Sequence, residues 1–201
     1  MGNFDKVKSN MKEAENLIPK QIPDGEGHVL RLKGNFEHSF GNYKEARILY
    51  KKAEDTFRKS LAGVPQYLNL GSVVVSQGNL EIDLENYSEA RKKFKYAEAL
   101  FQKSKDYLGE SMVIRGLGDV YSGEGDYTSA INNYNVALER FRNVLTNPLE
   151  DANTLFRLGK LYKKTNQLEE ARQFFTDALT KYKNCGCIIG EKDVKEQLKM
   201  F

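Results

Sequence analysis

Several sequence features are scarce in this chain of 201 residues, and each scarcity excludes a class of protein. Its two cysteines, Cys185 and Cys187, are too few for a disulfide framework and favour a reducing compartment. No apolar run approaches the length of a membrane span, and no signal-peptide core is present. The net charge of +3 is too small to require nucleic acid or an anionic membrane as a partner. We therefore expect a cytoplasmic protein that makes no membrane contact.

Patterns typical of catalysis and metal binding are also missing. His28 and His38 are ten residues apart on one expected helix, so they point in different directions and cannot form a metal site unaided. The two cysteines have no second ligand pair nearby. No glycine-rich phosphate loop follows a strand, and no order of residues suggests a Ser-His-Asp or Cys-His nucleophile. The sequence thus predicts no catalytic residue, no metal and no cofactor, and we expect the protein not to be an enzyme.

What the chain does contain is an internal repeat with four copies. Its glycine column is spaced by 44, 40 and 41 residues, and residues 33–53 and 77–97 share Gly-Asn, Asn-Tyr and Glu-Ala-Arg in register. Alanine follows each glycine after 12 and after 19 residues, and an aromatic residue follows after 16. These columns are Gly34, Gly78, Gly118 and Gly159; Ala46, Ala90, Ala130 and Ala171; Tyr50, Phe94, Tyr134 and Phe175; and Ala53, Ala97, Ala137 and Ala178. Such a register predicts a repeat architecture.

Each repeat predicts two helices joined by a short turn, because apolar residues recur at helical spacing on both sides of a Gly- or Asn-containing segment. Pro65 and Pro148 suit the first turns of two of these helices. The glycine and alanine columns let two helices approach closely, and the aromatic column fills the space between repeats. We expect an all-α solenoid of four helix-turn-helix repeats at 27–60, 65–105, 107–146 and 148–183.

Helices are also expected on both sides of the repeats, within a single domain of residues 1–201. Residues 3–18 carry apolar positions at helical spacing, and residues 190–201 predict a last helix. Both would cover the open ends of a solenoid, or they are half-repeats of a longer protein. The inward positions of the first helix are Phe4, Val7, Met11, Ala14, Leu17 and Ile18.

The order of glycine, tyrosine, alanine and aromatic columns, clearest in GLGDVYSGEGDYTSAINNYNVAL, resembles the tetratricopeptide repeat (TPR) over about residues 27–183. Repeat four departs from it at Asn166 and Leu168, and repeats one and two carry Glu37 and Glu81 where the family favours tyrosine. The period exceeds the usual length of about 34 residues. It is similar to the long repeats of Pins-type G-protein modulators, kinesin light chains and bacterial peptide-sensing regulators.

The resemblance implies a right-handed superhelix, an α-solenoid whose concave wall is formed by the first helix of each repeat. The candidate groove residues on that wall are Arg31, Asn35, His38, Asn79, Asp83, Arg115, Asp119, Lys160 and Lys163. Asparagine can bond both backbone groups of an extended peptide, and arginine and lysine can pair with its carboxylates. We therefore expect a non-catalytic interaction scaffold that binds a peptide segment of an acidic partner protein.

Two other functions remain open, and a third is not expected. The array could sense a small peptide and change its curvature. It could also act as a co-chaperone-like adaptor, because Arg31, Asn35 and Arg115 resemble parts of a carboxylate clamp, although Ser76 and Ser111 stand where the clamp has Asn and Lys. Nucleic-acid binding is not expected, because the basic stretches at 91–97 and 162–167 belong to outer helix faces.

Overall fold

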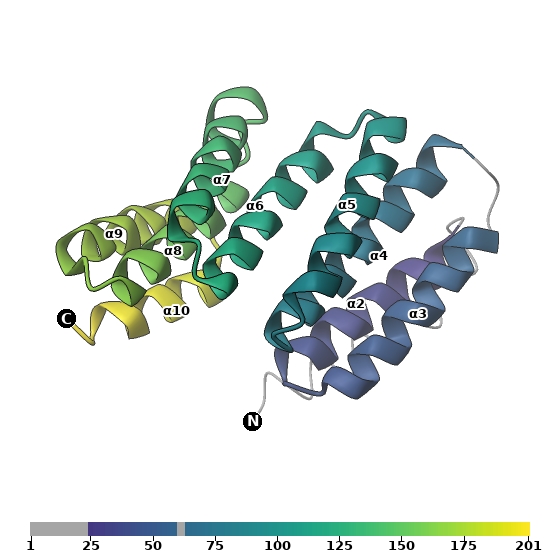
Figure 1. Cartoon of the computed structure of the whole chain (residues 1–201), viewed down its shortest axis with the longest axis horizontal. Coiled ribbons are helices and arrows are strands. Elements are labelled where there is room, and N and C mark those ends of the chain that lie inside the picture. The colour runs from purple at the N-terminus through teal and green to yellow at the C-terminus, as the bar shows by residue number, and fades with distance from the viewer. Residues whose placement is uncertain (1–23, 60–62) are drawn as a thin grey trace. The chain divides into compact units, whose positions relative to one another are not determined.

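Helices make up nearly all of the residues that the computed structural model describes, which are 24–59 and 63–201. These ranges contain no strand, which confirms the all-α prediction (Figure 1). The helix predicted for residues 3–18 lies outside the described residues. In chain order the helices are α2 (Gly25–Ser39), α3 (Tyr43–Lys59), α4 (Val64–Asp83), α5 (Tyr87–Ser104), α6 (Tyr107–Glu124), α7 (Tyr127–Glu139), the π-helix η1 (Arg140–Val144), α8 (Pro148–Lys164), α9 (Leu168–Asn184) and α10 (Ile188–Leu198).

Packing divides the chain into two compact units, Met1–Gly109 (unit 1) and Glu110–Phe201 (unit 2). In unit 1, α2 packs against α3 and α4 against α5, which gives repeats one and two (Figure 1). Unit 2 holds most of α6, then α7, the α8–α9 pair and α10. A single domain over residues 1–201 stays a prediction.

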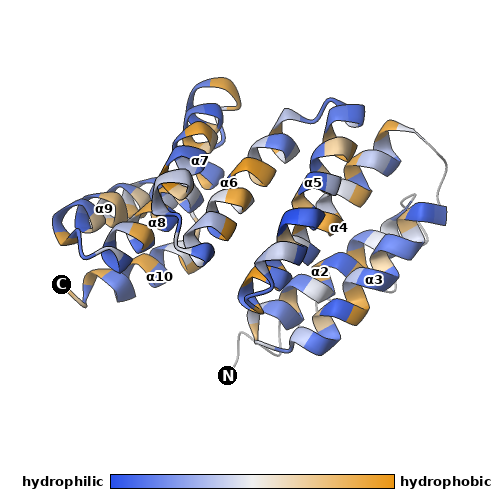
Figure 2. Cartoon of the chain, viewed as in Figure 1, coloured by the Kyte–Doolittle hydropathy of each residue, from blue (hydrophilic) through white to orange (hydrophobic). Residues whose placement is uncertain are grey.

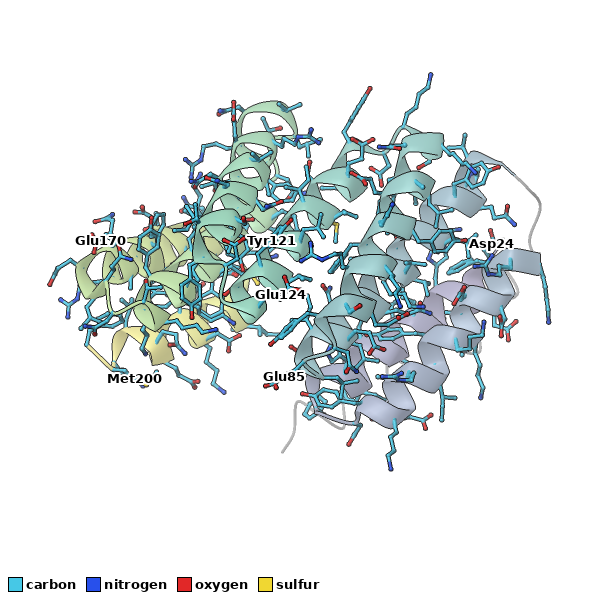
Figure 3. All side chains as sticks on the ribbon, in the orientation of Figure 1. Asp24, Glu85, Tyr121, Glu124, Glu170 and Met200 are labelled. Carbon is cyan, nitrogen blue, oxygen red and sulfur yellow. The ribbon has the colours of Figure 1, made fainter. Side chains whose placement is uncertain are left out.

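The small residues of the repeat lie where helices touch. Every alanine of the two alanine columns is fully buried. A Cβ placed on Gly34 would come within 2.5 Å of the Tyr50 ring, and one on Gly118 within 2.7 Å of the Tyr134 ring. The aromatic residue therefore covers the glycine of its own repeat, so no larger side chain fits there without rearrangement. Figure 2 shows hydrophobic and hydrophilic residues sharing each helix, as expected where one face is buried.

A second pair of packing columns repeats this contact nearer the other end of each helix pair. A Cβ on Gly27 would lie 2.5 Å from the Phe57 ring, and a Cβ on Gly71 would lie 2.5 Å from the Phe101 ring. Ser111 and Ala152 occupy the same column in repeats three and four and are fully buried. In repeats one and two, each helix pair is thus closed by two glycines that face two aromatic rings.

The turns inside the repeats all contain one left-handed residue at the same column. These residues are Gly41 (φ 76°), Glu85 (φ 59°), Gly125 (φ 86°) and Asn166 (φ 60°). Repeat four therefore makes the same turn with asparagine, the side chain that tolerates this region best after glycine.

The two glutamates that replace a tyrosine in repeats one and two are used locally. Glu37 accepts a hydrogen bond from Asn42 Nδ2 at 2.7 Å, and Glu81 accepts one from Asn86 Nδ2 at 3.0 Å. Each glutamate therefore ties the end of its own helix to the following turn. Glu81 is also buried and forms an ion pair with Arg47 at 2.9 Å.

The C-terminal helix covers the end of repeat four, as expected. Helix α10 packs against α9, its Gly190 lies under the Tyr182 ring, and its Val194 is fully buried. The ring of Phe201 lies 6.0 Å from the ring of Phe175, measured between centroids. The apolar face that repeat four would otherwise expose is therefore filled by the chain itself.

Candidate functional site

The predicted groove residues fall in both units. Arg31, Asn35 and His38 lie on α2, and Asn79 and Asp83 lie on α4, all in unit 1. The remaining candidates are in unit 2, on α6 and α8: Arg115, Asp119, Lys160 and Lys163. Each group is therefore built up within its own unit.

In unit 1, two of the candidates lie at the hydroxyl group of Tyr50, and a third contacts one of these two. This hydroxyl donates a hydrogen bond to Asn35 Oδ1 at 2.8 Å and lies 3.4 Å from His38 Nδ1. The other ring nitrogen of His38 lies 2.7 Å from Asp83 Oδ2, which joins α2 to α4. Burial raises the pKa of Tyr50, so its hydroxyl remains a neutral donor that fixes the orientation of the Asn35 amide.

Arg31 lies one helical turn before Asn35 and is half-buried. Within the ranges 24–59 and 63–201, its guanidinium group has no hydrogen-bond acceptor and no carboxylate at ion-pair distance. Burial lowers the pKa of Arg31, and Tyr50 only partly offsets this effect. Arg31 is thus a partly dehydrated cation without a counter-ion in the described part of the chain.

Asn79 is the second candidate in unit 1 whose polar group is uncommitted. Its side chain is half-buried on α4 and has no hydrogen bond to any residue that the structure describes. The corresponding Asn35 is held by the Tyr50 hydroxyl, whereas repeat two has Phe94 at the tyrosine column and so lacks this donor. The amide of Asn79 therefore keeps both its donor and its acceptor available.

In unit 2, the guanidinium group of Arg115 is already paired. Arg115 is only 7% exposed, forms a hydrogen-bonded ion pair with Glu150 of α8, and lies 5.4 Å from the centroid of the Phe141 ring. Burial lowers the pKa of Arg115 and the charge of Arg157 adds to this effect, while Glu150 opposes both. Arg115 therefore has a counter-ion, Glu150, whereas Arg31 has none among the described residues.

Asp119 is engaged in the same way. It accepts a hydrogen bond from the Tyr134 hydroxyl at 2.7 Å and lies 2.8 Å from Arg157 Nε in an ion pair between α6 and α8. Burial acts to lower the pKa of Arg157, but the Asp119 carboxylate outweighs it and raises the pKa overall. Asp119 is therefore a second carboxylate of unit 2 that pairs with a cation of the same unit, Arg157.

The two lysines of α8 differ in their surroundings. Lys160 is exposed, and its Nζ lies 5.4 Å from the centroid of the Phe156 ring. Lys163 Nζ donates a hydrogen bond to Gln197 Oε1 at 3.1 Å and lies 5.4 Å from the centroid of the Phe201 ring. The C-terminal segment therefore engages Lys163, while the Lys160 ammonium group faces solvent.

Glu150, Asn153 and Arg157 are parts of the unit 2 network that sequence reasoning missed. Asn153 accepts a hydrogen bond from the Tyr182 hydroxyl at 2.7 Å and donates one to Glu150. All three lie on α8 at spacings of three and four residues, the spacing that places side chains on one helix face. That spacing is the signal that could have found them.

No group of three or more potential metal ligands occurs among the described residues. Cys185 and Cys187 are both free thiols. None of the helices in the described ranges is long and apolar enough to cross a membrane.

Two family models match the chain, both described as tetratricopeptide repeat, at residues 69–143 and 115–184. Together they span residues 69–184, which is more than half of the chain. The chain belongs to the tetratricopeptide repeat family. TPR repeats indicate a protein–protein interaction scaffold, since TPR domains bind proteins or peptides and are generally non-catalytic. The likeness to the Pins-type and kinesin-light-chain subtypes stays a prediction.

Solved structures share the TPR fold at low sequence identity. Aspartyl phosphate phosphatase F from Bacillus subtilis matches with a TM-score of 0.66 and 13% identity, over 87% of this chain and 45% of that one. BtubC (BKLC) from P. vanneervenii matches with a TM-score of 0.61 and 14% identity, over 98% of this chain and 88% of that one.

A third structure is a signal transduction ATPase from Pyrococcus horikoshii with a tetratricopeptide repeat sensor. It matches with a TM-score of 0.64 and 17% identity, over 86% of this chain and 25% of that one. This TPR chain thus spans less than half of the first and third structures. No curated protein matches its sequence.

Proposed function

We propose that this TPR protein binds an acidic, extended segment of a partner protein through α2 and α4 of unit 1. The observation that carries the proposal is the half-buried guanidinium group of Arg31, which has no carboxylate partner within the described ranges. A carboxylate of the bound segment would supply the missing counter-charge. Arginine pairs with carboxylates through two parallel hydrogen bonds, and such bonds strengthen where water is partly excluded.

Asn35 and Asn79 provide the contacts that an extended backbone needs. Because Asn35 Oδ1 is held by the Tyr50 hydroxyl, its Nδ2 group is oriented as a donor. Asn79 offers a donor and an acceptor, which suits one C=O and one N–H of a peptide. His38 and Asp83 pair with each other, so they would position the neighbouring groups rather than bind the segment directly.

Residues that are already engaged do not belong to the proposed contact set. Arg115, Asp119 and Lys163 each have a partner inside unit 2, so the proposed binding face is narrower than the nine candidates of the sequence. The proposed role is that of a non-catalytic cytoplasmic adaptor that needs no cofactor.

Fluorescence anisotropy with a labelled, C-terminally amidated peptide of alternating Asp and Gly tests this function. We expect the full chain to bind this peptide in preference to a matched Lys-Gly peptide. Arg31→Ala should weaken binding about tenfold or more, the scale of a lost charge-assisted pair. Lys52→Ala is the matched control, because it removes one positive charge from an exposed position of α3. Equal losses in both variants, or equal binding of both peptides, would refute the proposal.

A further inference from the structure

Arg31 and Arg115 occupy the same position of the repeat, three residues before the column glycine. Repeats two and four have Val75 and Phe156 there, so only repeats one and three carry an arginine at this place. Each unit therefore contains one arginine of this kind, on the first helix of its first repeat. The two arginines can be compared position by position within their own units.

The two units differ in the residue that the following repeat carries at one position. Glu150, which pairs with Arg115, stands nine residues before Gly159. The residue nine positions before Gly78 is Asn69, which is neutral, buried and only 7% exposed. Asn69 Nδ2 donates a hydrogen bond to Asp24 Oδ2 at 3.4 Å, just before α2 begins. Unit 1 thus has a neutral amide at the position from which unit 2 sends a carboxylate to its arginine.

The second ion pair of unit 2 has neutral counterparts too. Asp119 follows Gly118 directly, and its partner Arg157 stands two residues before Gly159. Asn35 and Ser76 occupy these two positions in unit 1. Unit 2 therefore has two positive and two negative charges at these four positions, which are Arg115, Asp119, Glu150 and Arg157. The same positions in unit 1 are Arg31, Asn35, Asn69 and Ser76, and only Arg31 is charged.

We infer that one position in each unit, Asn69 in unit 1 and Glu150 in unit 2, decides whether the arginine of that unit binds an external carboxylate. This position lies nine residues before the column glycine of the unit's second repeat. Asn69 leaves Arg31 open, whereas Glu150 occupies Arg115 as an internal ligand. This inference rests on the proposed function in one respect, which is that the natural ligand of Arg31 is a carboxylate of a partner protein. It makes Asn69 and Glu150 specificity-determining residues that need not touch the bound segment.

The physical reason is competition at one guanidinium group. A glutamate tethered within reach of Arg115 acts at a high effective concentration, and a carboxylate from solution must displace it. Asparagine carries no charge, so it neither neutralises nor occupies Arg31. A carboxylate from solution then gains the full interaction with that cation.

Acetate, which has the carboxylate of an aspartate side chain, is the probe for the full chain, and the arginine Nε–Hε signals in NMR spectra are the readout. In the wild type, acetate should shift the signal of Arg31 and leave that of Arg115 in place. Asn69→Glu should weaken the Arg31 response about tenfold or more, because the new carboxylate pairs with Arg31. Gln102→Glu, which adds the same charge at an exposed position of α5, should leave the response unchanged. An Arg31 signal that ignores acetate in the wild type would overturn the inference.

Asp24 lies beside Asn69 and would repel a glutamate there, so Asp24→Asn combined with Asn69→Glu is the second variant. Circular dichroism melting shows whether each variant folds. The same tenfold weakening is expected in the double variant. An unchanged Arg31 response in both folded variants would contradict the role of Asn69.

The reverse change tests unit 2. Glu150→Gln keeps the shape of the side chain and removes its charge, so the Arg115 signal should begin to respond to acetate. A silent Arg115 signal in the folded variant would contradict the role of Glu150. The acetate experiments stand apart from the peptide assay. If acetate behaves as expected and the Asp-Gly peptide does not bind, the proposed function fails and the inference about the two positions survives.

Discussion

The two units share one packing scheme and differ in charge. Both close their helix pairs with glycine under an aromatic ring, as Gly34 and Tyr50 do in unit 1 and Gly118 and Tyr134 do in unit 2. In unit 2 the polar residues beside this contact form two internal ion pairs, whereas in unit 1 they leave Arg31 unpaired among the described residues. The comparison teaches that a repeat fixes where side chains are placed, while single positions decide whether they stabilise the fold or remain free to bind.

The largest difference between the units should appear when the residue beside the arginine is truncated. Glu150→Ala leaves the buried Arg115 without a counter-ion and should lower the free energy of unfolding by about 3–5 kcal/mol. Asn69→Ala removes a neutral amide and should cost about 1 kcal/mol. Urea denaturation of both variants measures the contrast. Equal losses in the free energy of unfolding would mean that the charge of Glu150 contributes no more to stability than the neutral amide of Asn69.

Overpacking should affect both units alike, because their alanine columns are equally buried. Ala90→Leu in unit 1 and Ala130→Leu in unit 2 should each cost about 1–3 kcal/mol, since both residues are fully buried between helices. Thermal unfolding of the two variants, compared with Lys52→Ala as a surface control, tests this equality. A variant that melts with the wild type would show that its alanine does not limit the approach of the helices.

The tyrosine hydroxyls offer a finer contrast. Tyr134→Phe removes a hydrogen bond to the charged Asp119 and should cost about 1.5–3 kcal/mol, whereas Tyr50→Phe removes one to the neutral Asn35 and should cost about 0.5–1.5 kcal/mol. The order of the two losses in urea denaturation is the test. The reverse order would argue against the ion-pair network around Asp119.

Acid should weaken unit 2 through Glu150. Burial acts to raise the pKa of Glu150, but Arg115 outweighs it and holds the pKa below the ordinary value of 4.5. Its stabilising effect is therefore complete above that value and is lost as the pH falls through the lower, folded-state pKa. Urea denaturation between pH 3 and pH 7, roughly the range over which carboxylates titrate, should give a shallower pH dependence for Glu150→Gln than for the wild type. Parallel pH profiles would rule out this coupling.

The fold could be predicted from the sequence because its signal is repeated. Gly34, Ala46 and Tyr50 recur in register in four copies, and helix packing requires small residues at such contacts. The second contact, between Gly27 and Phe57, was missed although Gly71 and Phe101 have the same spacing. Serine and alanine replace that glycine in repeats three and four, so this column is not conserved as glycine across the four repeats and is harder to recognise from the sequence.

The site was predicted only in part. Arg31 and Arg115 share a column, so the sequence treats them as equivalent, yet the structure pairs one and leaves the other without a partner in its described residues. The partner of Arg115 lies 35 residues further along the chain on another helix. The helical spacing of α8 indicates that Glu150 shares a face with Asn153 and Arg157, but it does not identify Arg115 as its partner, which becomes visible only when the repeats are packed.

The most direct test of the account is an arginine side-chain NMR titration of the full chain with the amidated Asp-Gly peptide. We expect the Nε–Hε signal of Arg31 to shift with peptide concentration, while the signals of Arg115 and Arg157 remain in place because Glu150 and Asp119 hold them. A shift of Arg115 or Arg157 with Arg31 unmoved would contradict it.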